Sequence, residues 1–124
     1  MAPRNIPTKL NLQKKFDTGK KGWFTGCCTL PNGQIIIIDN TKSKANLFDR
    51  EGSLLSTIDL SYPFDAYDVT VVDNNRVAVS NRKSKTISIV YVPTFKIVET
   101  LNTGYDIVGI AYRDGDIILS VSNK

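Results

Sequence analysis

A short polar segment occurs twice in this chain, and its spacing constrains the fold more than any other feature. Residues 40–44 read Asn-Thr-Lys-Ser-Lys, and residues 81–85 read Asn-Arg-Lys-Ser-Lys, 41 positions later. Each copy follows an apolar run and precedes a short strand-like segment. Turn residues recur in step with it, at positions 30–33, 72–75 and 112–115. A repeat of about 40 residues built from strands is typical of the blades of a β-propeller.

Ten segments between these turn signals have the composition of short β-strands, and no helical period competes with them. We expect strands at residues 24–30, 34–39, 44–49 and 54–60 in a first blade, 67–72, 76–80, 86–91 and 95–101 in a second, and 107–112 and 116–121 in a third. Four consecutive isoleucines, at residues 35–38, predict a strand that is buried on both faces. The predicted fold class is all-β, with four-stranded antiparallel meanders as its blades.

The repeat divides the chain into unequal units. Residues 1–7 form a tail, and residues 8–23 are expected to hold the outer strand of a preceding blade, centred on residues 9–17, and its link. That interpretation rests on Phe-Asp-Thr-Gly at residues 16–19, which parallels Leu-Asn-Thr-Gly at residues 101–104. Two whole blades follow, and then the first two strands of another, at residues 24–63, 64–104 and 105–124. The chain is thus predicted to be a partial propeller of about three blades, half of a six-bladed ring.

A partial ring leaves apolar sheet faces bare, because each blade is normally covered by its neighbours. Such a face recruits a partner or aggregates. One explanation is that the sequence is a piece of a longer chain. The other is a homodimer that closes a six-bladed ring, in which the last two strands of one copy and the first strand of the other form a three-stranded composite blade.

Composition excludes several classes of protein. Hydrophobic residues make up 41% of the chain and charged residues 23%, which is an ordinary globular mixture. The chain has neither a run of about 18 apolar residues nor a hydrophobic signal segment, so we expect a cytoplasmic protein. Histidine is absent, which excludes a Ser-His-Asp or Cys-His catalytic arrangement within the chain. We therefore expect no enzyme activity, no cofactor and no bound metal.

The two cysteines, Cys27 and Cys28, are adjacent. On a strand they point to opposite faces, so they cannot readily form a disulfide or share a metal. A reactive Cys27 would need Lys20 or Lys21 to activate it. We expect Cys27 to be a small core residue instead.

Acidic residues on the predicted inner strands and links raise one enzymatic alternative. Some propeller hydrolases hold calcium in the central channel, and the equivalent positions here are Gly26, Asp68 and Gly109. Calcium needs about six to eight oxygen ligands, which one carboxylate in three blades cannot supply. We expect Asp68 to accept backbone amide hydrogen bonds at the start of its strand. Asp65 and Asp106 are expected to order interblade turns.

Two turn sequences carry a family resemblance. Residues 24–34, Phe-Thr-Gly-Cys-Cys-Thr-Leu-Pro-Asn-Gly-Gln, and residues 47–52, Leu-Phe-Asp-Arg-Glu-Gly, resemble a repeat of the NHL type. From about residue 10 to residue 123 the chain is similar to the C-terminal propeller of tripartite-motif (TRIM)-like proteins. The resemblance implies a module that recognises protein substrates or RNA. Ubiquitin-ligase activity in that family needs a RING domain, and this chain lacks the Cys and His zinc ligands of one.

Charges sort unevenly between the two faces of the predicted ring. In a four-stranded meander, the second turn and the link to the next blade share one face, and the first and third turns share the other. The second-turn face collects the basic residues Lys20, Lys21, Lys42, Lys44, Arg82, Lys83 and Lys85. The aromatic residues near it are Trp23, Phe64, Tyr67 and Tyr105. The opposite face is mixed to acidic.

Lysine and arginine bind phosphates, and exposed aromatic rings stack on bases. The sequence therefore predicts a non-enzymatic recognition module that binds protein or single-stranded RNA through its basic face, and the family resemblance implies RNA binding at the same face. Three other interpretations stay open at this point. The Lys-Ser-Lys segments are also compatible with solvated turns, with the aromatic side chains packed between blades. A purely self-associating half-propeller is the second possibility, and a fragment of a calcium-dependent propeller hydrolase is the third.

Overall fold

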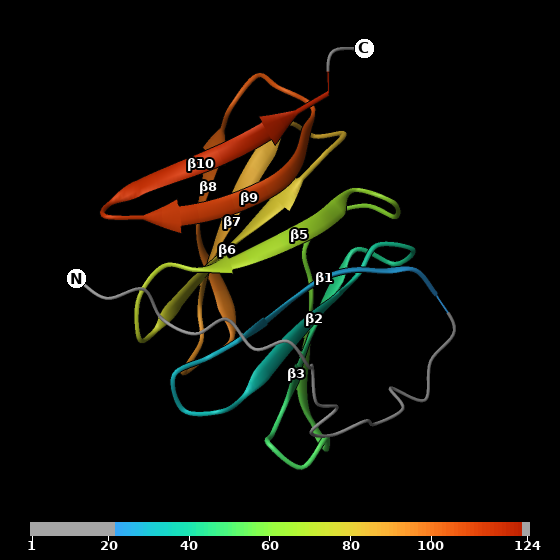
Figure 1. The fold of residues 1–124 in the computed structure, drawn as a ribbon. Coiled ribbons are helices and arrows are strands. Elements are labelled where there is room, and N and C mark those ends of the chain that lie inside the picture. The colour runs from blue at the N-terminus through green and yellow to red at the C-terminus, as the bar shows by residue number, and fades with distance from the viewer. Residues whose placement is uncertain (1–21, 123–124) are drawn as a thin grey trace, which may run out of the picture.

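The computed structural model describes residues 22–122, which form ten strands in three antiparallel sheets (Figure 1). The first sheet contains β1 (Phe24–Thr29), β2 (Ile35–Asp39), β3 (Lys44–Phe48) and β4 (Leu54–Asp59). The second contains β5 (Ala66–Val71), β6 (Arg76–Asn81), β7 (Thr86–Tyr91) and β8 (Lys96–Asn102). The third contains β9 (Ile107–Arg113) and β10 (Asp116–Val121). The strand expected at residues 9–17 lies outside the described residues.

Each sheet is a meander, because its strands are hydrogen-bonded in the order in which they occur in the sequence. The first strands of the three sheets lie together, with β5 between β1 and β9 (Figure 1). The Thr25 hydroxyl donates a hydrogen bond to the Tyr67 carbonyl and so links β1 to β5 directly. The described chain is therefore all-β and has the architecture of a partial propeller, as predicted.

Two apolar clusters fill the spaces between successive sheets. The first lies between the first and second sheets and includes Ile36, Ile38, Val77 and Val79. The second lies between the second and third sheets and contains Ala78, Ile87, Ile89, Ile107 and Ile110. Strand β6 contributes to both, because its alternate side chains point to opposite faces and a sheet covers each face.

Burial on both faces was expected for the isoleucine run and is found only in part. Ile36 and Ile38, which face the second sheet, are fully buried. Ile35 and Ile37 point to the other face of β2 and are half-buried. Strands β6 and β7 are covered on both faces, because their sheet is the one that lies between two others.

The structural repeat is one residue longer than the spacing of the two matching polar segments in the sequence. Asp39 pairs with Lys44 across the second turn of the first sheet, and Asn81 pairs with Thr86 across that of the second. Equivalent positions are thus 42 residues apart, whereas the two Asn-x-Lys-Ser-Lys segments are 41 apart. The same polar sequence therefore occupies different positions in the two turns.

Backbone geometry at these turns confirms the offset. Ser43 and Lys85, 42 residues apart, adopt positive φ angles of 51° and 61°. Their carbonyl oxygens accept hydrogen bonds from the backbone of the following link, at Leu60 and Thr103 respectively, with both distances 2.9 Å. A serine and a lysine thus hold the same left-handed position, which is uncommon for residues other than glycine.

No helix in the described part of the chain has the length and apolar character needed to cross a bilayer.

Candidate binding faces

Hydrogen bonds between turns define the two faces of the molecule. The backbone amide of Phe64, in the link between the first two sheets, donates to the Asn40 carbonyl in a second turn at 2.9 Å. On the other side, the Val92 amide in a third turn donates to the Asn75 carbonyl in a first turn at 2.7 Å. We call the first side, formed by residues 22–23, 40–43, 60–65, 82–85 and 103–106, the link face. We call the second side, formed by residues 30–34, 49–53, 72–75, 92–95 and 114–115, the opposite face.

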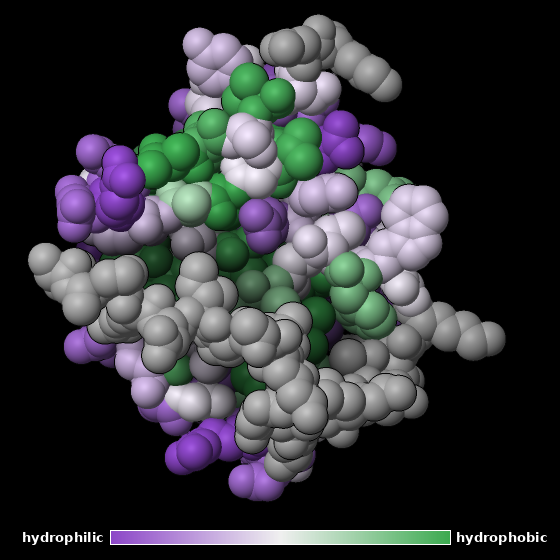
Figure 2. Space-filling model, viewed as in Figure 1, coloured by the Kyte–Doolittle hydropathy of each residue, from purple (hydrophilic) through white to green (hydrophobic). Residues whose placement is uncertain are grey.

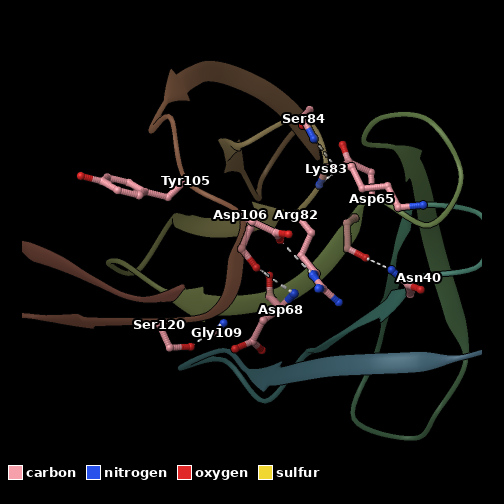
Figure 3. Close-up of polar contacts among 12 residues, drawn as sticks. Asn40, Asp65, Asp68, Arg82, Lys83, Ser84, Tyr105, Asp106, Gly109 and Ser120 are labelled. Atoms are coloured by element: carbon pink, nitrogen blue, oxygen red, sulfur yellow. Dashed lines mark hydrogen bonds and ion pairs between the residues drawn. The ribbon is translucent and has the colours of Figure 1, made fainter. Parts of the chain in front are cut away.

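Asp65 organises the link face (Figure 3). Its side chain is fully buried, and Oδ1 accepts hydrogen bonds from the backbone amides of Lys83 at 2.6 Å and Ser84 at 2.9 Å. Its backbone amide donates to the hydroxyl of Ser43 in the first sheet, at 2.9 Å. The expected role of Asp65 in ordering an interblade turn is confirmed, because this one residue joins the second turns of two sheets.

Asp106 occupies the position equivalent to Asp65 one sheet later, but it acts differently. Its Oδ1 accepts a hydrogen bond from Nε of Arg82 at 3.1 Å (Figure 3). The same guanidinium lies over the Tyr67 ring, 5.5 Å from its centroid. Arg82 is thus held by a carboxylate and an aromatic face, so its charge is largely satisfied within the protein.

Lysines remain the cations with the most open surroundings on this face. Nζ of Lys83 lies 5.7 Å from the centroid of the Phe64 ring. Lys42 and Lys85 are exposed, and neither forms an ion pair with a described residue. Lys44, by contrast, pairs with Asp59 at 3.4 Å. Lys20 and Lys21 lie outside the described residues.

Three aromatic side chains are exposed at intervals of 41 residues along the sequence. The exposed fraction is 70% for Trp23, 47% for Phe64 and 61% for Tyr105. These three side chains do not pack between the sheets, which was the alternative left open by the sequence. Tyr67, the fourth aromatic residue predicted for this face, is half-buried. Trp23 is fixed by its backbone, since its amide donates to the Thr41 hydroxyl at 3.0 Å and its carbonyl accepts from the amide of residue 40 at 2.8 Å.

Asp68 lies on β5 where the three inner strands converge, and its carboxylate is occupied by backbone donors. Oδ1 accepts from the Val69 amide at 2.9 Å, and Oδ2 accepts from the Ile110 amide on β9 at 3.1 Å. The predicted backbone-capping role is confirmed. A Cβ atom at Gly26 would lie 2.7 Å from Oδ1 of Asp68, so glycine is needed there for β1 to approach β5.

Cavities of about 450 Å³ and about 300 Å³ lie on either side of Asp68, lined chiefly by β1 and by β9 and β10 respectively. Within residues 22–122, no group of three His, Cys, Asp or Glu side chains is placed to hold a metal ion. Both carboxylate oxygens of Asp68 accept amide hydrogen bonds.

The expected position of Cys27 in the core is wrong. Cys27 is exposed and lines the larger cavity, whereas Cys28 packs against the cluster between the first two sheets. Burial raises the pKa of the Cys28 thiol to about 12, so this thiol stays protonated at neutral pH. Adjacent residues do point to opposite faces as predicted, but the sequence did not reveal which face a second sheet would cover.

Comparison with solved structures places this architecture in a known class. The chain aligns with virginiamycin B lyase from Staphylococcus aureus at a TM-score of 0.73 and 15% identity, covering 86% of this chain and 37% of that one. It aligns with Kuenenia stuttgartiensis hydrazine synthase at a TM-score of 0.74 and 15% identity, covering 91% and 33%. For AztD from Citrobacter koseri the TM-score is 0.65, the identity 14% and the coverage 81% and 28%.

These neighbours are β-propeller proteins, and the chain spans about a third of their length. No protein-family model and no curated protein matches the sequence. The class is therefore that of a partial β-propeller, defined by fold alone.

Proposed function

We propose that this chain is part of a non-enzymatic recognition module that binds single-stranded RNA through its link face. The observation that carries the proposal is the series of exposed rings at residues 23, 64 and 105, on the same face as the exposed Lys42, Lys83 and Lys85. Every base offers a π-face to an aromatic ring, and every nucleotide offers a phosphate to an ammonium group. The NHL-like turns at residues 30–33 and 47–52 support a relationship to the recognition propellers of TRIM-like proteins.

RNA fits this surface better than an acidic peptide does, because one of its lysines lies over an exposed ring and two further exposed rings share the face. Lys83 lies over Phe64, so a phosphate bound by the ammonium group brings the neighbouring base close to an exposed ring. An acidic peptide would use the lysines and leave the three rings without a role. Arg82 serves as a positioning residue here, since Asp106 and Tyr67 already hold it.

Fluorescence anisotropy with a labelled single-stranded RNA of about 12 nucleotides tests the proposal. Three lysine contacts predict that the logarithm of the binding constant falls with the logarithm of salt concentration with a slope of about −2. Changing Lys42, Lys83 and Lys85 together to Glu should abolish binding. Tyr105→Ala should weaken binding by roughly tenfold, because stacking contributes about 1–3 kcal/mol per base.

A matched variant on the other side of the molecule provides the control. It changes Arg50 of the opposite face together with Lys96 and Arg113, at the strand ends next to that face, to Glu; the net charge changes by the same amount, and these side chains are exposed. This variant should keep most of the affinity, with folding of both variants checked by circular dichroism. Equal losses in the two variants would show attraction by net charge alone and would contradict the proposal. Binding of a poly-glutamate peptide that Tyr105→Ala leaves unchanged, without RNA binding, would identify a protein partner instead.

A second candidate function is assembly. The third sheet has two described strands where the others have four, and Ile118 of β10 is 46% exposed. Figure 2 shows apolar side chains gathered over β9 and β10. We propose that a second copy of the chain covers this surface in a homodimer.

A further inference from the structure

A polar cavity of about 310 Å³ lies on the opposite face, between the first and second sheets. Four carboxamide side chains line it, those of Asn32, Gln34, Asn74 and Asn75. Its floor and edge are apolar and are formed by Leu47, Val92 and Pro93. None of these lining residues carries a charge. The volume is at the lower end of the range of small-molecule sites, about 300–1,000 Å³.

The first sheet supplies two carboxamides that are already oriented. Oδ1 of Asn32 accepts the Gln34 backbone amide at 2.9 Å, and Nδ2 of Asn32 donates to Oε1 of Gln34 at 2.9 Å. These two bonds leave Nε2 of Gln34 with both of its N–H groups to donate. The side of the cavity formed by the first turn therefore presents hydrogen-bond donors.

The second sheet supplies two carboxamides whose backbone is fixed while their side chains remain available. The backbone amide of Asn75 donates to Oδ1 of Asp73 at 2.9 Å, and its carbonyl accepts the Val92 amide at 2.7 Å. No described residue forms a hydrogen bond with the side-chain amide of Asn74 or Asn75. Each of these amides can both donate and accept.

Asp73 and Arg76, next to the cavity, neutralise each other. Asp73 forms an ion pair with Arg76 at 2.7 Å, and the Arg76 side chain lowers the pKa of Asp73 through that hydrogen bond. The floor is apolar, since Leu47 and Val92 are buried members of the cluster between the sheets. An uncharged ligand with several groups that donate and accept, and with one apolar side, matches this lining.

We propose that this carboxamide cavity binds a neutral, hydroxyl-rich small molecule of the size of a monosaccharide. Hydroxyl groups both donate and accept, so they complement the donors of the first turn and the mixed groups of Asn74 and Asn75. The C–H face of a pyranose ring would rest on Val92 and Pro93. A nucleobase would lack a stacking partner, because no aromatic residue lines the cavity. The site is independent of the link face.

Nuclear magnetic resonance tests this inference through the side-chain amide signals of asparagine and glutamine. The probes are methyl α-glucopyranoside, methyl β-galactopyranoside and methyl α-mannopyranoside, each titrated into the whole chain. We expect at least one glycoside to shift the side-chain amide signals of Gln34, Asn74 and Asn75, with a dissociation constant of about 1 mM or below.

Removing the two carboxamides of the second sheet should weaken that binding about tenfold, because two hydrogen bonds are lost. The variant carries Asn74→Ala and Asn75→Ala, which leave the backbone bonds of residue 75 in place. Asn102→Ala, on the other side of the molecule, is the control and should bind like the parent. If the double variant does not fold, Asn74→Asp tests the same contact by replacing one amide nitrogen with oxygen.

Absence of side-chain amide shifts with all three glycosides would overturn the inference. So would shifts that persist at full size in the variants, or shifts confined to signals of the link face. RNA binding by the link face is measured separately, by fluorescence anisotropy. The outcome of the glycoside titration and the outcome of the RNA titration are therefore independent of each other.

Discussion

At the scale of single residues, Asp65 links two sheets through its carboxylate and its backbone amide. It accepts two amide hydrogen bonds from the second turn of its own sheet, while its backbone amide is bonded to Ser43 in the previous sheet. The sequence indicated this role, because an aspartate in a short link commonly caps a turn. It did not indicate the partners of Arg82, since Tyr67 and Asp106 lie 15 and 24 positions away and meet it only in the folded chain.

Asp65→Ala should lower the free energy of unfolding by about 2–3 kcal/mol, because the buried amides of Lys83 and Ser84 lose their acceptor. Asp65→Asn keeps an acceptor oxygen in the same place and should recover most of that loss. Urea denaturation followed by circular dichroism measures both changes. Equal destabilisation by the two variants would show that the negative charge, and not the acceptor, is what the fold requires.

At the scale of secondary-structure elements, all ten strands lie within one residue of the bounds predicted from the sequence. Turn residues mark strand ends clearly, which explains this agreement. The register of the repeat could not be predicted in the same way. It depends on which residues pair across the turns and on bulges such as the one at Thr25 in β1, and both are set by contacts between strands.

Gly26→Ala tests how closely β1 must approach β5. An added Cβ would lie 2.8 Å from the Cα atom of Asp68, which is backbone and cannot move aside. We expect the free energy of unfolding to fall by about 2–3 kcal/mol. Gly109→Ala is the matched variant on β9: its Cβ would meet Oγ of Ser120 at 2.8 Å, a side-chain atom that can rotate away. Its cost should be smaller, and denaturation curves that show equal costs would argue against close packing of β1 on β5.

At the scale of the whole molecule, burial is uneven. Each side of the second sheet packs against an apolar cluster, whereas β10 presents Ile118 and Val121 to solvent. The period of the repeat predicted a partial propeller, and the apolar surface over β9 and β10 follows from that architecture. Composition and pattern do not determine what covers this surface, because any apolar partner of suitable shape would satisfy the same residues.

A second copy is the partner that can be tested most directly. If a homodimer forms, sedimentation equilibrium should give twice the chain mass of 13.8 kDa. Ile118→Asp should then return the protein to the monomer mass without loss of β-structure, because a charge on this surface opposes its burial. Val98→Asp is the control: Val98 is also exposed but lies on the outer strand β8, away from the surface over β9 and β10, so the dimer should persist. A folded species with the mass of one chain at every concentration would exclude assembly of this kind. RNA binding by the link face would then be the remaining candidate function.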